Sequence, residues 1–291
     1  MLLKDLVRKG VKALKALYPE PEARSMVLLL CQERLGVMSY THIVEPATEV
    51  PGEELEGLLE DIDRMAGGEP IQYVLGYTEF RGRIFKTDSR ALIPRIETEH
   101  LVEEVVSHAH EVPVREGEAL RILDLCTGSG CIAWSLAYEL PGAVVTASDI
   151  SDDALALARS QFRRLPSKVV RPQFMKGDIL DLSTPFPCCD ILTANPPYIT
   201  LPEKEFMRPN VLDWEPEIAL FAPSGDALAF HKAIAVWAGK LLCTGGLGIV
   251  EINEDLGAPS LEVFRRAGFE NAVLVEDFAG KERFVRFNKP L

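Results

Sequence analysis

The stretch TANPPYIT, residues 193–200, places an amide side chain, two prolines and an aromatic ring directly after the apolar run CDILTA. Proline fixes its own φ angle and has no N–H group, so Pro196 and Pro197 end the strand and hold this corner rigidly. The Asn195 side-chain oxygen and the Pro196 carbonyl could each accept one hydrogen of an NH2 group, while Tyr198 packs on the planar group that carries it. We therefore predict a corner that orients a weakly nucleophilic NH2 nitrogen for attack on a methyl group.

A second motif, DLCTGSG at 124–130, follows a predicted strand and begins a predicted helix. Gly128 and Gly130 allow a tight turn and a close approach of the backbone to a ligand. Asp149 ends the next predicted strand, where a carboxylate can accept hydrogen bonds from both hydroxyls of a ribose. This pattern predicts a nucleoside-containing cofactor. With Ala133 it also fits the G-x-G-x-x-A fingerprint of a nicotinamide dinucleotide site.

Two further carboxylates favour S-adenosylmethionine over a dinucleotide. Asp124 precedes the glycine loop, where it could lie near the methionine ammonium group. Asp178 follows the third predicted strand, where it could accept a hydrogen bond from the adenine amino group while Ile179 packs on the ring. Since no open loop for a pyrophosphate is evident, S-adenosylmethionine is the predicted cofactor.

The elements that must position these motifs fall into two parts. Residues 1–66 carry apolar side chains at helical spacing and no strand candidate, which predicts a small helical domain. Residues 67–93 are rich in β-branched and aromatic residues broken by glycines, which predicts a β-hairpin linker. Within 94–291, strands and helices alternate from residue 121 and end in an antiparallel pair. We therefore predict an α/β fold with a doubly wound, mostly parallel sheet.

The loop from about 199 to 224 is long for a connection inside a compact domain, and it is rich in proline. Loops of this length are typical of lids and partner-binding surfaces. We expect this loop and the helical domain to clamp a macromolecular substrate, with Phe206, Met207 and Trp214 either in contact with it or packed inside the loop.

Composition excludes several other classes. The net charge of −13, from 31 basic and 44 acidic residues among 291, argues against binding along a nucleic-acid backbone. The six cysteines form no CxxC pair and have no histidine at ligand spacing, so no metal is expected. The sequence shows neither a secretory signal nor an apolar run long enough for a membrane span. We expect a cytoplasmic protein, with a mitochondrial location as the alternative because the first residues are basic and amphipathic.

Three stretches together resemble the HemK/PrmC family of protein-(glutamine-N5) methyltransferases: GEPIQYVLGYTEFRGRIFKTDSRALIPRIETEHLVEEV, ILDLCTGSGCIA and NPPYI. The likeness extends from about residue 67 to the C-terminus, and the helical leader also suits the family. ALIPRIETE is the more specific part, because NPPY is shared with adenine-N6 DNA methyltransferases. WEPEIALFAPSGD, residues 214–226, resembles the family segment that follows the motif.

The resemblance implies a seven-stranded, Rossmann-like methyltransferase domain that methylates the glutamine of the GGQ motif in class 1 peptide chain release factors and so modulates translation termination. It implies that the catalytic residues are Asn195, Pro196 and Tyr198, with Pro197 also binding the glutamine. The residues expected at the cofactor are Asp124, Cys126, Thr127, Gly128, Ser129, Gly130, Asp149, Asp178, Ile179, Asn195 and Arg95. The family usually has glycine where Cys126 stands; a cysteine fits there without strain only if its φ angle is negative.

Three alternatives remain open at this point. A DNA or RNA amino-group methyltransferase, acting on adenine N6 or guanine N2, would flip a base into the same corner. An NAD-dependent oxidoreductase would use the glycine fingerprint, but no catalytic His, Lys or Tyr pair follows the fold in the usual way. A binding module without catalysis would not need Asn195 or Tyr198.

Overall fold

The computed structural model describes residues 1–223 and 225–290, which form two compact units. The helical unit consists of Met1–Tyr77 together with Arg208–Trp214. The sheet unit consists of Thr78–Met207 and the described residues from Glu215 onward. In the part of the chain that the structure describes, no helix is long and apolar enough to cross a membrane.

The helical unit is a small bundle around one apolar core. Its helices are α1 (Leu3–Leu14), α2 (Glu20–Leu35), α3 (Thr41–Val44), α4 (Gly52–Ala66), α5 (Ile71–Leu75) and α9 (Pro209–Leu212). α1 packs closely on α2 and α4 because Gly10 has no side chain; a Cβ there would lie 2.9 Å from a Val27 methyl and 3.2 Å from Ile62. Arg208 pairs with Glu22 at 2.7 Å, so part of the long loop belongs to this bundle.

The hairpin is shorter than the predicted linker, 67–93. Ile71–Leu75 form α5 rather than a strand, and only β1 (Tyr77–Phe80) and β2 (Arg83–Lys86) pair. α5 begins after Pro70 and ends at Gly76, whose φ is 82°. These two boundary residues outweigh the β-branched composition of the segment because they supply a helix start and a left-handed helix end.

The sheet unit contains a seven-stranded sheet in the order β5-β4-β3-β6-β7-β9-β8. Its strands are β3 (Arg121–Leu125), β4 (Val144–Asp149), β5 (Gln173–Lys176), β6 (Cys189–Ala194), β7 (Leu242–Glu251), β8 (Val273–Glu276) and β9 (Glu282–Asn288). β3 to β7 are parallel, while β9 is antiparallel to both of its neighbours, β7 and β8. The predicted doubly wound fold with a closing antiparallel pair is therefore confirmed.

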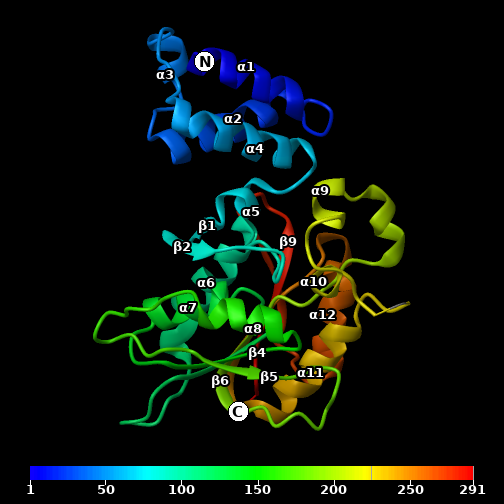
Figure 1. Cartoon of the computed structure of the whole chain (residues 1–291). Helices are drawn as coiled ribbons and strands as arrows, with labels where there is room; N and C mark the ends of the chain where they lie inside the picture. Colours follow the sequence, from blue (N-terminus) through cyan, green and yellow to red (C-terminus); the bar gives the residue numbers. More distant parts are fainter. Residues whose placement is uncertain (224, 291) are drawn as a thin grey trace. The chain divides into compact units, whose positions relative to one another are not determined.

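Helices cover both faces of this sheet (Figure 1). They are α6 (Ile96–His108), α7 (Cys131–Glu139), α8 (Asp152–Arg159), α11 (Ala229–Leu241) and α12 (Gly257–Arg266). Short helices stand in the connections: η1 (Ala109–Glu111), η2 (Leu201–Phe206), α10 (Glu217–Leu220) and η3 (Glu254–Leu256). The loop after β6 is therefore not structureless, since it carries η2, α9 and α10.

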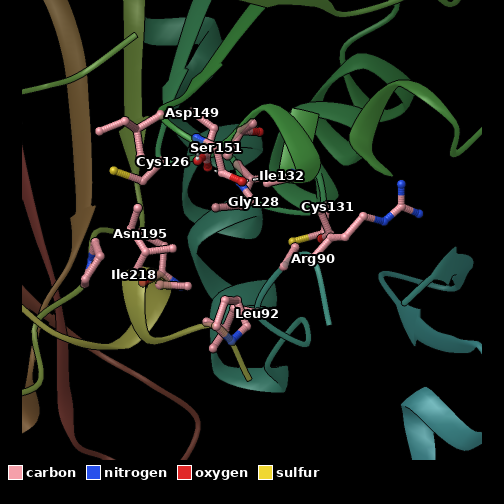
Figure 2. A pocket seen from close by; sticks show the side chains of 18 of the residues that line it. Arg90, Leu92, Cys126, Gly128, Cys131, Ile132, Asp149, Ser151, Asn195 and Ile218 are labelled. Carbon is pink, nitrogen blue, oxygen red and sulfur yellow. Dashed lines mark hydrogen bonds between the residues drawn. The ribbon is translucent and has the colours of Figure 1, made fainter. Parts of the chain in front are cut away.

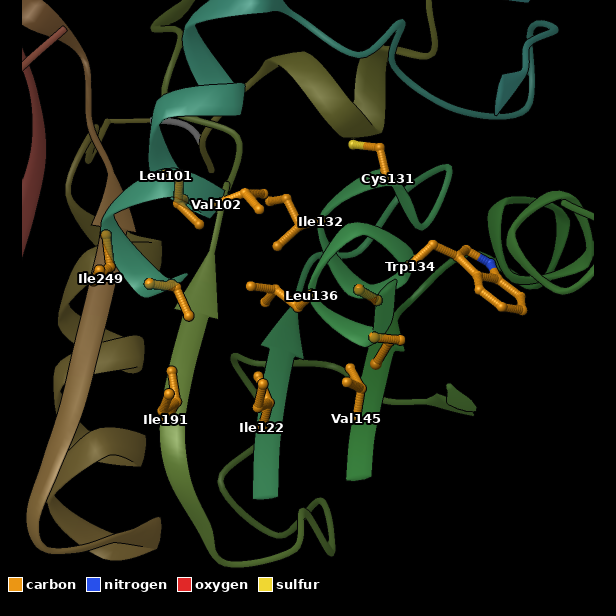
Figure 3. Packing of buried hydrophobic residues seen from close by; sticks show 14 of the residues in the cluster. Leu101, Val102, Ile122, Cys131, Ile132, Trp134, Leu136, Val145, Ile191 and Ile249 are labelled. Carbon is orange, nitrogen blue, oxygen red and sulfur yellow. The ribbon is translucent and has the colours of Figure 1, made fainter. Parts of the chain in front are cut away.

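The core on one face is formed by α6 and α7 against the sheet (Figure 3). Leu101 of α6 lies on the side of Ile191 of β6, and Leu136 of α7 lies over Ile122 of β3; all four side chains are buried in one cluster. On the other face α11 and α12 pack against the same strands. Because both faces are covered, β6 is buried along its whole length, and the ends of the parallel strands are held firmly.

Strand register brings the predicted motifs to one edge. Leu125, the last residue of β3, is level with Ser148 of β4 on one side and with Ala194 of β6 on the other. The chain order reverses between β3 and β6, which is the position where doubly wound sheets bind ligands. The glycine loop, Asp149 and the NPPY corner therefore begin side by side.

Candidate active site

A cleft of about 990 Å³, including the part open to solvent, lies at this edge (Figure 2). Its walls come from the loops after β3, β4, β5 and β6, from residues 90–98 and from α10. Of the residues predicted at the cofactor or substrate, those that line the cleft are Arg95, Cys126, Thr127, Gly128, Ser129, Asp149, Asp178, Ile179, Asn195 and Pro197.

The glycine loop takes the form that its sequence predicts. Gly128 and Gly130 have φ angles of 53° and 82°, a region that glycine adopts without strain. A Cβ on Gly130 would lie 3.0 Å from the Cβ of Ala158 and 3.1 Å from the Trp134 ring. Glycine at this position therefore lets α7 begin close to α8. Gly130 lies behind the loop and does not line the cleft.

Asp149 is anchored by backbone donors. Its Oδ2 accepts a hydrogen bond from the Gly128 N–H at 2.8 Å, and its Oδ1 accepts one from the Ser151 N–H at 3.0 Å. Burial raises the pKa of this carboxyl, against the lowering effect of those N–H groups. Each oxygen of a carboxylate can accept two hydrogen bonds, so both retain an acceptor position for a ribose hydroxyl.

Asp124 lies in the wall behind the cleft. It is fully buried and accepts hydrogen bonds from the Thr127 hydroxyl at 2.6 Å and from the Thr193 hydroxyl at 2.8 Å. Burial raises its pKa to about 7. In this arrangement Asp124 ties the glycine loop to β6. Its contact with a methionine ammonium group stays a prediction.

Cys126 adopts the conformation that its side chain disfavours. Its φ angle is 57°, so the backbone is left-handed, the case in which a cysteine does not fit without strain. The side chain lines the cleft (Figure 2). Burial, and then the nearby Asp149, Asp124 and Asp178, raise the pKa of the thiol. Cys126 is therefore a neutral, strained residue inside the site.

The NPPY corner positions its amide through a hydroxyl on α6. Asn195 Nδ2 donates a hydrogen bond to the Thr98 hydroxyl oxygen at 3.2 Å. With the nitrogen engaged in this way, the side-chain oxygen of Asn195 is the atom available to accept a hydrogen bond from a substrate. Pro196 and Pro197 are buried, and the half-buried Tyr198 donates its hydroxyl hydrogen to Glu251 at 3.3 Å. Pro196 and Tyr198 lie beside the cleft rather than in its lining.

Arg95 lines the cleft, but its guanidinium group is paired. It contacts Glu215 at 2.5 Å, and the Glu215 side chain also accepts the Ile93 N–H at 3.1 Å. Glu215 is almost completely buried, so this ion pair fixes the segment 93–95 against the start of α10. The predicted contact between Arg95 and a cofactor stays a prediction.

Sequence reasoning did not single out Thr98, Glu215 or Glu251 as functional residues. Glu215 lies in the EP segment of the family resemblance, which was a usable signal. Glu251 ends an apolar strand, the same signal that identified Asp149. Thr98 stands in the first turn of α6 and carries no local signal of a role.

The described part of the chain holds no cluster of three or more His, Cys, Asp or Glu residues able to bind a metal ion. Within it, what the cleft offers is a carboxylate anchored by a backbone N–H group, a glycine turn and an amide oxygen oriented by Thr98. This set of groups fits S-adenosylmethionine and a substrate NH2 group.

Comparison with known proteins identifies the family to which the chain is similar. A family model described as the PrmC N-terminal domain matches residues 5–76, and one described as a methyltransferase domain matches residues 122–208. A release factor glutamine methyltransferase of Bacteroides thetaiotaomicron is 38% identical over 288 residues, which cover 96% of this chain and 97% of that protein. One of Flavobacterium psychrophilum is 34% identical over 291 residues, covering 99% of each chain.

Among solved structures, the 16S rRNA N2 G1207 methyltransferase of T. thermophilus, in complex with AdoMet and guanosine, superposes with a TM-score of 0.51. The two sequences are 17% identical, and the matched region covers 73% of this chain and 49% of the other. At this level of identity, the likeness shows a shared fold.

Proposed function

The chain belongs to the family of release factor glutamine methyltransferases, and we propose on this basis that it methylates the glutamine amide nitrogen in the GGQ motif of a class 1 peptide chain release factor. S-adenosylmethionine is the methyl donor, and the modification modulates translation termination. The observation that carries the proposal is the Asn195 side chain, whose nitrogen is held by Thr98 so that its oxygen serves the substrate.

Different residues at the strand ends bind different parts of S-adenosylmethionine. Asp149, with its two oxygens fixed by backbone N–H groups, binds the ribose hydroxyls. Asp178 and Ile179 lie in the same cleft after β5 and bind the adenine. The glycine loop allows the backbone to approach the amino-acid part of the cofactor. When bound, S-adenosylmethionine supplies a methyl group on a positively charged sulfur.

The NPPY corner prepares the nucleophile. The Asn195 side-chain oxygen and the Pro196 carbonyl each accept one hydrogen of the glutamine NH2 group, and this holds the amide plane in one orientation. Both acceptors are rigid, because Pro196 and Pro197 are buried and the Asn195 amide is fixed by Thr98. Such positioning lowers the barrier without a strong base, since the nitrogen loses its proton only after it has formed the new bond.

Tyr198 covers the planar carboxamide from the side. Its hydroxyl is tied to Glu251, which holds the ring at the corner. Burial, followed by the charge of Glu251, raises the pKa of the phenol, so Tyr198 remains neutral at physiological pH. Its role is packing and orientation, not proton transfer.

The loop after β6 provides further contacts for the release factor. Phe206, at the end of η2, is 88% exposed, which is unusual for a phenylalanine in a monomer. We propose that it contacts the release factor outside the GGQ loop, and that the helical unit assists docking. Phe206→Ser should raise KM for release factor several-fold while leaving the Kd for S-adenosylhomocysteine unchanged. An unchanged KM would remove Phe206 from the docking surface. A release factor substrate also places the enzyme where translation takes place, the cytoplasm of a bacterial-type cell.

The test of function is methyl transfer from labelled S-adenosylmethionine to three substrates offered separately. They are intact class 1 release factor, its GGQ-to-GGA variant and duplex DNA. We expect label on the intact release factor alone. Label on the GGA variant would place the modification on another residue, and label on DNA would show the amino-group methyltransferase alternative to be the correct one.

A further inference from the structure

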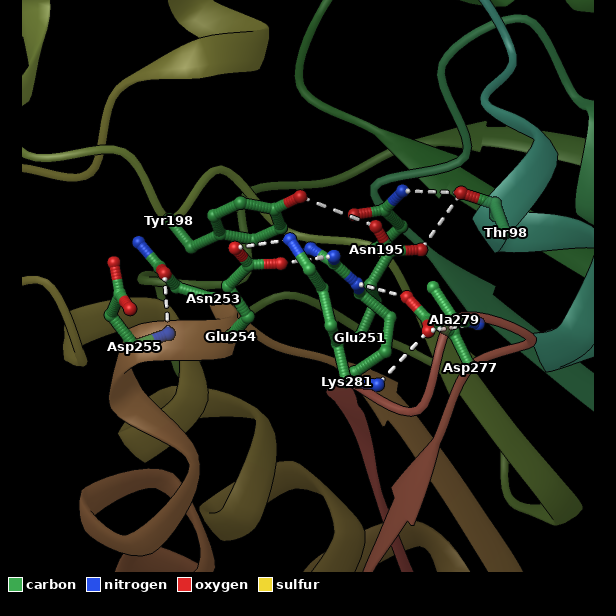
Figure 4. A network of polar contacts seen from close by, with 11 residues as sticks. Thr98, Asn195, Tyr198, Glu251, Asn253, Glu254, Asp255, Asp277, Ala279 and Lys281 are labelled. Atoms are coloured by element: carbon green, nitrogen blue, oxygen red, sulfur yellow. Dashed lines mark hydrogen bonds and ion pairs between the residues drawn. The ribbon is translucent and has the colours of Figure 1, made fainter. Parts of the chain in front are cut away.

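Glu251, the last residue of β7, lies directly beside the NPPY corner (Figure 4). β7 is the parallel neighbour of β6, and Val250 of β7 is level with Ala194 of β6. The Glu251 side chain is 2% exposed. A buried carboxylate is costly unless it is well hydrogen-bonded, so its partners are informative about its role.

The two oxygens of this carboxylate hold two different parts of the corner. Oε2 accepts a hydrogen bond from the Thr98 hydroxyl at 2.8 Å, and Oε1 accepts one from the Tyr198 hydroxyl at 3.3 Å. Thr98 in turn accepts a hydrogen bond from Asn195 Nδ2 at 3.2 Å. Glu251 is therefore connected to both side chains that contact the substrate in the proposed function, although it does not line the cleft.

The direction of these hydrogen bonds depends on the carboxylate. An ionised carboxylate only accepts, so the single hydroxyl hydrogen of Thr98 must point towards Glu251. The Thr98 oxygen can then only accept from Asn195, which fixes the Asn195 amide with its nitrogen towards Thr98 and its oxygen towards the cleft. If the direction of these hydrogen bonds were reversed, the NH2 end of Asn195 would face the substrate NH2 group. Two sets of donors would then face each other.

The groups around Glu251 act on its ionisation in opposite directions. Burial raises its pKa to about 7, opposed by the hydrogen bond from Thr98 and by the positive charge of Arg283 on β9. Glu97 on α6 adds a smaller raising effect. His231 of α11 contacts the backbone carbonyl of Glu251 at 3.1 Å, and burial lowers the pKa of its imidazole to about 4. At pH 8 the carboxylate is ionised and His231 is neutral.

We propose that Glu251 is the positioning residue of the methyl-transfer site, which sets the donor-to-acceptor direction of the chain Asn195–Thr98–Glu251 and holds the Tyr198 ring. This inference rests on the proposed function, because it assumes that Asn195 receives a substrate NH2 group. It adds that a residue outside the cleft determines which end of Asn195 the substrate meets.

The first test is Glu251→Gln, assayed at pH 8 on release factor. Glutamine keeps the shape but carries one NH2 end, so it cannot accept from Thr98 and from Tyr198 at once. If the NH2 end faces Thr98, the Asn195 amide is turned over; if it faces Tyr198, the ring loses its acceptor. We expect kcat to fall on the order of 100-fold, the cost of misplaced reacting groups, with the Kd for S-adenosylhomocysteine within threefold of wild type.

A pair of variants at Thr98 tests the same series of hydrogen bonds, because Thr98 is its middle residue. Thr98→Val has nearly the same shape but no hydroxyl group, and should lower kcat as strongly as Glu251→Gln. Thr98→Ser keeps the hydroxyl group and should restore most of kcat. This pair keeps the inference testable if the glutamine variant does not fold.

Asp190→Asn is the matched control. Asp190 is also a buried carboxylate, at the opposite end of the neighbouring strand β6, where it pairs with Arg121 at 2.8 Å. Loss of that carboxylate weakens the ion pair with Arg121, but kcat of the folded protein should stay near wild type. A general effect of removing a buried charge would appear in this control as well.

The outcomes separate the two proposals. If the wild-type protein does not methylate release factor, the proposed function fails, and this inference fails with it. If the wild type is active but Glu251→Gln keeps kcat within threefold, or Thr98→Val is as active as Thr98→Ser, the inference is wrong while the proposed function stands. The inference would also be wrong if the variants lost activity because they bind S-adenosylhomocysteine more weakly while their kcat stayed unchanged.

Discussion

Cys126 offers the sharpest test of backbone strain in the glycine loop. Its φ angle of 57° costs a residue with a Cβ atom about 1 to 2 kcal/mol. Glycine avoids this cost but adds about 0.5 to 1 kcal/mol of chain entropy to the unfolded state. The difference predicts that Cys126→Gly stabilises the sheet unit by roughly 0.5 to 1 kcal/mol, or about 1 to 3 °C in Tm.

Cys131 supplies a matched control for that substitution. It is five residues away, in the first turn of α7, where the backbone is helical and glycine costs about 1 kcal/mol. Cys131→Gly should therefore lower Tm while Cys126→Gly raises it. The difference in Tm between the two variants removes the effects that any replacement of cysteine by glycine has in common in this protein.

Thermal unfolding followed by circular dichroism, with and without S-adenosylhomocysteine, measures both variants, and calorimetric titration gives the Kd. We expect Cys126→Gly to bind S-adenosylhomocysteine at least as tightly as wild type, because the backbone strain is relieved and the cleft gains space. The reasoning is refuted if Cys126→Gly unfolds at a lower temperature than wild type, or binds tenfold more weakly. Either result would show that the thiol contributes more than its backbone conformation costs.

Three further predictions concern the corner, the ribose site and acid stability. Asn195→Ala should keep the fold and the Kd for S-adenosylhomocysteine but lower kcat on the order of 100- to 1,000-fold, as for loss of a preorganised polar group; turnover near wild type would contradict the role given to its oxygen. Asp149→Asn should raise the Kd for S-adenosylhomocysteine about tenfold or more in calorimetric titration, because an amide cannot accept from both the Gly128 N–H and two ribose hydroxyls. His231→Gln should lose less stability than wild type in urea titrations between pH 6.5 and 4.5. Burial lowers the pKa of His231 to about 4 in the folded protein. As the pH falls below 6.5, the unfolded wild-type chain therefore binds a proton at His231 that the folded chain does not bind, and the folded state loses stability. An equal loss in both proteins would show that His231 titrates normally in the folded state.

Motifs that act through neighbouring residues were predictable from the sequence. Gly128, Gly130 and Asp149 follow from the rule that parallel strands bind nucleotides at their carboxyl ends, and Asn195 follows from the rigid corner after a buried strand. All four lie at the edge where the sheet order reverses. The alternation of strands and helices fixed this fold class, because each strand had to find a parallel neighbour.

Residues whose roles depend on distant partners were not predictable in the same way. Thr98 and Glu251 meet only because β7 pairs with β6 and α6 packs against β7, an arrangement that no local pattern specifies. The sequence does not predict the left-handed backbone of Cys126, since cysteine has no preference for this conformation. The β-branched composition of 67–93 predicts a hairpin throughout, whereas Pro70 and Gly76 set the boundaries of the short helix α5 within it.

The interior position of β9 bears on how the chain is made. Translation delivers β7 and β8 before β9, yet in the finished sheet β9 lies between them, and among the described strands it is the only one paired with β8. Until β9 has been synthesised, the edge of β7 that pairs with it is therefore unpaired, and β8 lacks its partner strand. Arg283, which β9 brings towards Glu251 and Tyr198, arrives with this late strand. The enzyme thus becomes competent only after its own synthesis has passed this strand.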